Sequence, residues 1–178
     1  MKTKNFKLRI QSSLPLINLK SKIIDYINDY PCCVNYPKCY HAKKQSNAIL
    51  HEQTFAKDLV QDYLTNLNFF CTHYAIKYSK INYLQMWAFH TTVGQAVDSI
   101  KHNHIHDKNS YEISSILYFD NGNLGTTLFC NDAFTIELKE IKEQWIFFES
   151  KVDHEPHKGI SDKERVVLAT SIGLCLEN

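Results

Sequence analysis

The stretch HIHDKNSYEISSILY, residues 104–118, joins closely spaced histidines to an apolar strand that is rich in β-branched residues. His104 and His106 are two residues apart, and a further histidine precedes them at His102. In an extended chain, the side chains at positions i and i+2 project to the same face. His104 and His106 can therefore bind one metal ion together, and the stretch predicts a metal site at the beginning of a core strand.

A second cluster of histidines lies downstream. The apolar run 145–148 predicts a buried strand, which leads through polar residues to His154 and then to His157. A lone histidine is more often a core or surface residue than a ligand, but these two clusters each adjoin an apolar strand. We predict that His104, His106 and His154 bind the metal, and that His102 and His157 lie outside its coordination shell.

Arg165 begins the next apolar run, and it is one of only two arginines in the chain, the other being Arg9. Lysine supplies nearly all of the positive charge. An arginine at the start of a core strand indicates carboxylate binding, because the planar guanidinium can donate two parallel hydrogen bonds. The residues leave open an alternative, in which Arg165 forms a structural ion pair with Asp162 or Glu164.

The composition is that of an ordinary globular protein. The chain has 178 residues, of which 44% are hydrophobic and 22% charged, with a formal net charge of +1. We expect one domain, residues 1–178, with a mainly helical part (1–68) and a β-rich part (69–178). The near-neutral charge gives no indication of nucleic-acid binding, and the sequence has no apolar run of membrane-spanning length. We expect a cytoplasmic protein whose six cysteines are reduced.

Hydrophobic periodicity divides the chain into helices and strands. Apolar residues at helical spacing predict helices at 14–30 and 48–67. The intervening segment 30–41 is either a loop over a site or a plain connection. Alternating or apolar runs predict strands near 69–77, 83–90, 95–100, 113–119, 124–130, 133–138, 144–149 and 165–174, with Asn121-Gly122 as a hairpin turn. Eight strands after two helices fit a mainly β fold, a jelly roll or double-stranded β-helix.

The order of these motifs resembles a known family. It runs His-x-His, a strand ending in Tyr118, Gly125-x-Thr-x-Phe, Phe147-Phe-x-Ser, His154 and finally Arg165. This order resembles the iron(II)- and 2-oxoglutarate-dependent oxygenases, especially the prolyl-hydroxylase-like branch and the short oxygenases predicted in bacteria and phages. The resemblance covers roughly residues 85–175, about half of the chain.

The resemblance implies specific roles. His104 and His154 match the two histidine ligands of iron, and Arg165 matches the residue that grips the far carboxylate of 2-oxoglutarate. Tyr118 falls where that branch has a tyrosine whose hydroxyl bonds the same carboxylate, although a strand tyrosine is often simply core. The implied cofactors are Fe(II) and 2-oxoglutarate, with dioxygen as the oxidant.

The sequence departs from the family at the second ligand. The family motif is His-x-Asp or His-x-Glu, and no histidine here has an acid two residues later. Either His106 takes the place of the carboxylate, which gives a three-histidine site, or a local bulge brings Asp107 into that place.

The sequence thus predicts a hydroxylase that acts on a peptidyl or small amino-acid-like substrate. The alternative is a cupin-like three-histidine metal protein, such as a thiol dioxygenase, an isomerase or a ligand binder, in which Glu112 could supply an acid. Two further residues are interpreted as structural: Thr126 as an ordinary strand residue and Trp87 as core beneath the site.

Overall fold

The computed structural model of the chain describes residues 6–13, 18–31, 45–97, 100–107, 109–131, 134–139 and 141–177. Its helices are α1 (Leu19–Asp29), η1 (Leu50–Glu52), η2 (Thr54–Ala56) and α2 (Lys57–His73). Its strands are β1 (Leu8–Ser12), β2 (Tyr78–Thr91), β3 (Ala96–Val97), β4 (Tyr111–Asn121), β5 (Thr126–Asn131), β6 (Phe134–Leu138), β7 (Gln144–Glu149), β8 (Asp153–Pro156), β9 (Gly159–Ile160) and β10 (Arg165–Leu176).

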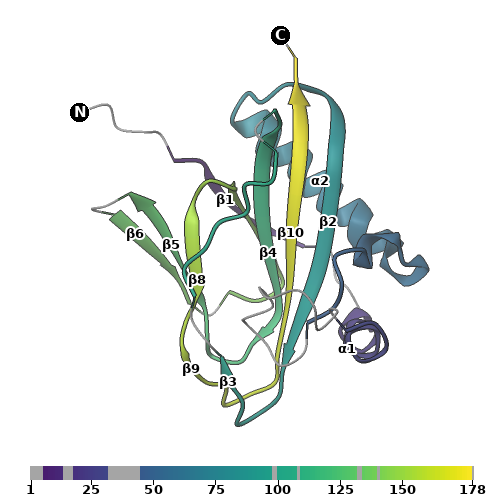
Figure 1. Cartoon of the computed structure of the whole chain (residues 1–178), viewed down its shortest axis with the longest axis vertical. Coiled ribbons are helices and arrows are strands. Elements are labelled where there is room, and N and C mark those ends of the chain that lie inside the picture. Colours follow the sequence, from purple (N-terminus) through teal and green to yellow (C-terminus); the bar gives the residue numbers. More distant parts are fainter. Residues whose placement is uncertain are drawn as a thin grey trace.

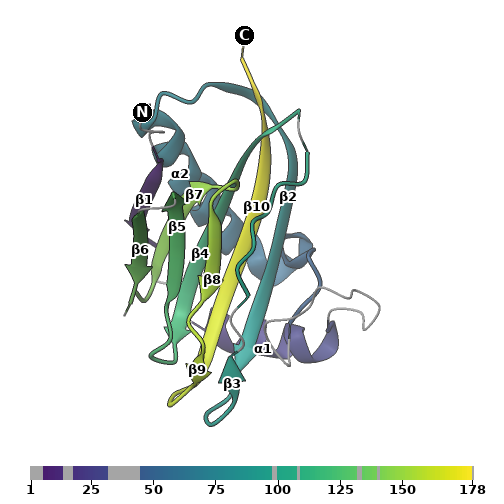
Figure 2. The same cartoon turned by 60° about the vertical axis from the view of Figure 1, so that its left-hand side comes forward.

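Two antiparallel sheets face each other. The large sheet has the strand order β1-β7-β4-β10-β2, and the small sheet has the order β6-β5-β8. β3 and β9 form a short two-stranded sheet. Figures 1 and 2 show α1 and α2 on one side of the large sheet and the small sheet on the other. This arrangement confirms the predicted mainly β fold, a double-stranded β-helix with N-terminal helices.

The central strand β10 shows why both faces of the large sheet are covered. Val166 and Leu168 belong to the core beneath the helices, whereas Val167 belongs to the core between the sheets. Successive side chains of a strand point to opposite faces, so an uninterrupted apolar run is buried on both. Arg165 shares the inner face with Val167, and the strand therefore points its one cation between the two sheets.

α2 covers the outer face of the large sheet with one apolar stripe. Its buried residues Leu59, Tyr63, Leu67 and Phe70 recur at helical spacing. The Tyr63 ring lies 5.1 Å from the ring of Trp145, which also donates a hydrogen bond to Asp62 at 2.7 Å. The helix is thereby fixed against β7, the strand that leads to His154.

The helical part of the chain is longer than predicted. α2 continues to His73, through part of the segment 69–77 that was predicted as a strand, and past the expected boundary at residue 68. Phe70 and Cys71 continue the buried stripe, while Phe69 is exposed, so the aromatic run belongs to a helix and not to a strand. The strand predictions from 83–90 onward are confirmed, except that 95–100 contains only the two residues of β3 and partly lies outside the described residues. The short strands β1, β8 and β9 were not predicted.

The turn after β4 does not form a hairpin. β5 pairs with β6 and β8, so residues 121–125 connect the large sheet to the small one. Gly122 has a φ of 56°, and a Cβ added there would lie 2.0 Å from Ser161 Oγ and 2.9 Å from Arg165 Cβ. Only glycine fits this conformation and this close approach to Arg165.

Most of the segment 30–41 lies outside the described residues, because residues 32–44 are not described. The start of the helix predicted at 14–30 also lies outside them, at residues 14–17. Among the residues that are described, no helix has both the length and the apolar character needed to span a membrane.

Candidate functional site

Residues 100–107, which we call the histidine segment, connect β3 to β4 and border the main cavity. The amides of His102 and His154 each donate to the carbonyl of the other, at 3.0 and 2.8 Å. The His104 amide donates to the Ser150 carbonyl at 3.2 Å. These bonds hold the segment beside β8 and the end of β7, so its side chains face the same space as those of β8.

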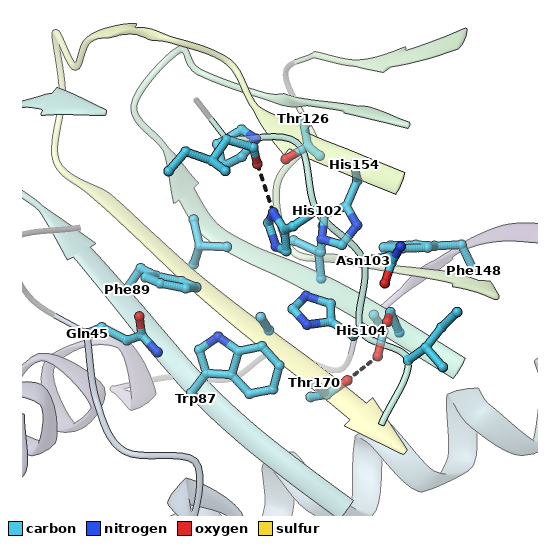
Figure 3. Close-up of a pocket in the computed structure, with 18 of the residues that line it drawn as sticks. Gln45, Trp87, Phe89, His102, Asn103, His104, Thr126, Phe148, His154 and Thr170 are labelled. Atoms are coloured by element: carbon cyan, nitrogen blue, oxygen red, sulfur yellow. Dashed lines mark hydrogen bonds between the residues drawn. The ribbon is translucent and has the colours of Figure 1, made fainter. Parts of the chain in front are cut away.

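The rings of His102, His104 and His154 gather at one point of the cavity (Figure 3). The ring centroids lie 4.9 Å apart for His102 and His104, 4.3 Å for His102 and His154, and 5.0 Å for His104 and His154. One potential ligand atom from each residue lies within 4.8 Å of the other two. Within the described part of the chain, these three residues form the one such cluster of histidine, cysteine or acidic side chains.

Two backbone carbonyls determine which ring nitrogens can bind a metal. His102 Nδ1 lies 2.8 Å from the Ile100 carbonyl oxygen, and His154 Nδ1 lies 3.3 Å from that of Val152. A carbonyl oxygen only accepts, so each Nδ1 carries the proton and each Nε2 keeps its lone pair. Three nitrogens bound to one ion at about 2.1 Å lie roughly 3–3.4 Å apart, a spacing that small ring rotations would reach. The three side chains therefore fit a divalent metal ion.

The structure brings His102, rather than the predicted His106, to His104 and His154. His106 is exposed, and its ring lies 6.1 Å from those of both His104 and Tyr83. It still borders the cavity. The spacing i, i+2 admits both histidine pairs, and the antiparallel pairing of His102 with His154 decides between them.

The acidic residues considered for the site have other partners. The Glu112 carboxylate, 8% exposed, accepts from the amides of His106 and Asp107 at 2.9 and 2.7 Å and from the Tyr83 hydroxyl at 2.5 Å. Burial raises the pKa of Tyr83, and the bond to Glu112 raises it further. Asp107 accepts from the Asn109 amide and the Ser110 hydroxyl, which lower the pKa of its carboxyl. Glu112 thus fastens the end of the histidine segment, and neither acid belongs to the histidine cluster.

Arg165 is a buried cation without an acidic partner among the described residues. Its side chain is 4% exposed, and its Nε has no hydrogen-bond partner there. The alternative ion pair is not formed, because Glu164 pairs with Lys20 and His90, and Asp162 accepts from Asn123. Burial lowers the pKa of Arg165, but a guanidinium remains charged in proteins. Because Arg165 also borders the cavity, its guanidinium is placed to bind an anionic group of a ligand there.

Tyr118 supports Arg165 from behind. The Arg165 Cζ lies 5.7 Å from the centre of the fully buried Tyr118 ring. The Tyr118 hydroxyl forms a hydrogen bond with the Thr126 hydroxyl, and Thr126, unlike Tyr118, borders the cavity. Thr126 was interpreted as an ordinary strand residue. Its contact with Tyr118 depends on the packing of the small sheet against the large one, for which the sequence holds no local signal.

The cavity has a volume of about 590 Å³. Its described wall contains no acidic side chain and only one permanent cation, Arg165. Aromatic and aliphatic side chains make up much of the remainder, and Trp87, predicted as core beneath the site, is part of the wall. The lining residues are Gln45, Trp87, Phe89, Ile100, His102, Asn103, His104, Ile105, His106, Ser114, Ser115, Ile116, Thr126, Phe148, His154, Pro156, Arg165, Val167, Ala169 and Thr170.

No protein-family model matches the sequence, and no curated protein matches it either. Solved structures do resemble the chain. A prolyl-4-hydroxylase from Pseudomonas putida is similar with a TM-score of 0.67 and 12% identity, covering 96% of this chain and 94% of that one. The viral collagen prolyl hydroxylase of Paramecium Bursaria Chlorella virus-1, in its 2OG complex, is similar with a TM-score of 0.62 and 16% identity, covering 94% and 96%. A 2OG-Fe(II) oxygenase family oxidoreductase from Burkholderia pseudomallei is similar with a TM-score of 0.63 and 11% identity, covering 94% of this chain and 84% of that one.

The chain has a 2OG-Fe(II) oxygenase-like fold. At these identities the likeness concerns the fold alone, so the chemistry must be argued from the site. Within this oxygenase-like fold, the three histidines and Arg165 border one cavity between the two sheets. The arrangement can hold a metal ion at one point and a carboxylate at another.

Proposed function

We propose that the protein is an iron(II)- and 2-oxoglutarate-dependent oxygenase that hydroxylates a peptidyl or amino-acid-like substrate. His102, His104 and His154 would hold the iron, and Arg165 would bind the distal carboxylate of 2-oxoglutarate. One observation carries this proposal: the cavity that contains three converging histidines also contains a buried guanidinium with no acidic partner among the described residues.

The histidines suit iron(II) with open coordination positions. Imidazole binds zinc, copper, iron and nickel, and three ligands on one side leave the other positions for exogenous groups. When bound, iron(II) and 2-oxoglutarate supply the chemistry, in which dioxygen is consumed, succinate and carbon dioxide form, and one oxygen atom enters a C–H bond of the substrate. The carbonyls of Ile100 and Val152 keep Nε2 of His102 and His154 directed toward the common point.

Arg165 supports a dicarboxylate rather than a neutral co-substrate. A buried guanidinium without an acidic partner destabilises the protein, and a carboxylate placed against it would offset that cost through two hydrogen bonds. The Thr126 hydroxyl borders the cavity nearby and can donate to the same carboxylate. Tyr118 acts as a positioning residue, since its ring packs beside the guanidinium and its hydroxyl orients Thr126.

Aromatic side chains line the metal end of the cavity. Trp87 lies with its ring centre 5.3 Å from that of His104, and Phe148 lies 5.1 Å from His154. Both contacts have edge-to-face geometry, which suits aromatic rings. Such walls would protect the reaction from bulk solvent and hold the imidazoles in place.

A peptidyl substrate is supported by the fold. The similar viral protein is a collagen prolyl hydroxylase, so a chain of this architecture can act on a residue within a polypeptide. The cupin-like alternative loses its acid, because the Glu112 carboxylate is held by the backbone of the histidine segment.

The test is an anaerobic titration of the protein with iron(II) and then with 2-oxoglutarate. The visible charge-transfer absorption of the chelate should appear only when both are present, and admission of air should produce succinate. The matched variants are Arg165→Gln and Arg9→Gln, since these are the only two arginines and Arg9 lies on β1, away from the cavity.

We expect Arg165→Gln to abolish the response to 2-oxoglutarate at concentrations that saturate the native protein and Arg9→Gln. Iron binding without any response to 2-oxoglutarate in the native protein would contradict the proposal. A native-like response in Arg165→Gln would contradict the role of the arginine.

A further inference from the structure

The inner face of the large sheet is ordered in rows across three strands. Along β10 these rows are Thr91, Arg165 and Asn121; then Phe89, Val167 and Tyr118; then Trp87, Ala169 and Ile116. Alternate residues of a strand are about 6–7 Å apart, so the Ala169 row lies about 13 Å from the Arg165 row. The cavity extends over all three rows.

2-Oxoglutarate is too short and too small to fill this cavity. Its five carbons are joined by four bonds and span about 5 Å, since three backbone bonds of an extended residue span about 3.5 Å. Its ten non-hydrogen atoms occupy at most roughly 300 Å³, taking about 30 Å³ for each as for a water molecule. Anchored on Arg165, it would leave about half of the 590 Å³ cavity, including the row of Ala169.

The remaining compartment lies at the metal end, between a wide wall and a small floor residue. Trp87, 8% exposed, forms the wall and also contacts the ring of His104. Ala169, 9% exposed, is the floor residue between Trp87 and Ile116. Ala169 pairs with Trp87, whose ring contacts that of His104, and its methyl side chain takes up little of the cavity there.

The described side chains around Trp87 and Ala169 carry no permanent charge. The Ser114 hydroxyl forms a hydrogen bond with Ser150, so its polar group is already paired. Arg165, the only permanent charge of the described wall, lies two rows away. A charged group placed against Trp87 and Ala169 would lose its hydration and find no oppositely charged side chain beside it among the described residues. An uncharged hydrocarbon group would instead bury apolar surface against the indole.

Two partly or fully exposed amide side chains also line the cavity. Gln45 lies beside β2 near Trp87, and Asn103 lies in the histidine segment, where its amide donates to Asp153 at 2.8 Å. Ile105, which also belongs to the histidine segment, has an exposed side chain that lines the cavity. Amide and aliphatic groups of this kind are complementary to a polypeptide backbone and its neighbouring side chains.

We infer that the compartment formed by Trp87, Ala169 and Ile116 is the subsite for the reacting residue, and that it accepts an uncharged, mainly hydrocarbon side chain of a peptide and rejects charged ones. This deepens the proposed function, because the subsite places a substrate C–H bond next to the metal site. Ala169 determines the size of the side chain that fits.

The test measures equilibrium binding under anaerobic conditions, where turnover cannot occur. The probes are the N-acetyl methylamides of leucine, proline, lysine and glutamate, added to the full-length protein with and without iron(II) and 2-oxoglutarate. Calorimetry gives affinities, and tryptophan fluorescence reports on Trp87, since the second tryptophan, Trp145, is fully buried on the other face of the sheet. The variants are Ala169→Val, Ala169→Leu and, as a size-matched control at an exposed site, Ala96→Leu.

We expect the leucine or the proline probe to bind at least tenfold more tightly than the charged probes. Ala169→Leu should weaken that binding at least tenfold and Ala169→Val less, with iron affinity retained, while Ala96→Leu should behave as the native protein. Equal affinity for charged and neutral probes, no binding of either neutral probe, or native-like binding by Ala169→Leu would overturn the inference. The native protein gives the first two results even if a variant does not fold. Failure of the proposed function would appear separately, as absent iron or 2-oxoglutarate binding in the same titrations.

Discussion

The choice of His102 over His106 as a metal ligand can be decided by a pair of single substitutions. We expect His102→Ala to lose most of its iron(II) affinity and His106→Ala to keep it. Both residues belong to the same segment and lie two positions from His104, so the pair differs in geometry and not in composition or local sequence.

The expected loss can be estimated from the coordination. Four-ligand zinc sites bind with about 10–16 kcal/mol, or about 2.5–4 kcal/mol for each ligand. Iron(II) binds nitrogen ligands more weakly than zinc, so the lower value applies and corresponds to about a 100-fold loss of affinity. His106, whose ring is 6.1 Å from that of His104 and outside the cluster, should change affinity by no more than about twofold.

The assay is anaerobic calorimetry with iron(II), repeated with cobalt(II), whose visible spectrum reports coordination number. Circular dichroism of both variants would show that the fold is kept. A strong loss in His106→Ala together with native affinity in His102→Ala would refute the geometric argument. Equal losses in both would show that the segment as a whole, and not a ligand set, determines affinity.

Four further outcomes follow from the structure. Arg165→Gln should weaken 2-oxoglutarate binding about 30- to 1,000-fold while leaving iron affinity unchanged in calorimetry, because truncating one partner of a buried charge pair costs about 2–4 kcal/mol. Glu112→Gln should lower iron affinity and, in urea unfolding, stability by about 1.5–3 kcal/mol, since Oε1 of Glu112 accepts from the amides of His106 and Asp107 and from the Tyr83 hydroxyl, whereas a neutral amide oxygen has two lone pairs for these three donors. Gly122→Ala should destabilise the protein by about 1–3 kcal/mol and weaken 2-oxoglutarate binding more than iron binding, because its Cβ would meet the base of Arg165. Burial lowers the pKa of His157 in the folded protein, so the unfolded chain takes up this proton at a higher pH than the folded one does. The stability of the protein should therefore fall as the pH decreases below about 6.5. His157→Gln should reduce this pH dependence in thermal melts at pH 7.5 and 5.5.

The fold class could be predicted because the strong signals in this sequence are local. The apolar runs that contain Ile116, Phe147 and Leu168 are each long enough to indicate a strand buried on both faces. The error at α2 arose because Phe69, Phe70 and Cys71 satisfy both a strand pattern and the end of a helical stripe. Local propensity cannot separate the two, and the packing of Phe70 in the core beneath the helices decides for the helix.

The site was predicted less completely because its geometry depends on pairing between distant strands. His104, His154 and Arg165 were identified from their positions beside apolar runs, and the structure places all three around one cavity. The assignment of His106 depended on spacing alone, whereas the bridge between His102 and His154 is a contact across fifty residues of sequence. Thr126 meets Tyr118 and the cavity only because the two sheets pack together, so no local pattern could have identified it.

The position of Arg165 at the first residue of β10 also restricts how that strand can pair. A slip of one residue would turn Arg165 toward the apolar core beneath the helices and bring Val166 and Leu168 into the cavity. A cation forced among Trp145, Phe147 and their neighbours would cost several kcal/mol, so the misaligned sheet would be disfavoured. The residue that we propose to recognise the co-substrate would therefore also select the native strand alignment during folding. A substitution that replaces Arg165 with an apolar residue would remove this energetic penalty on the misaligned sheet.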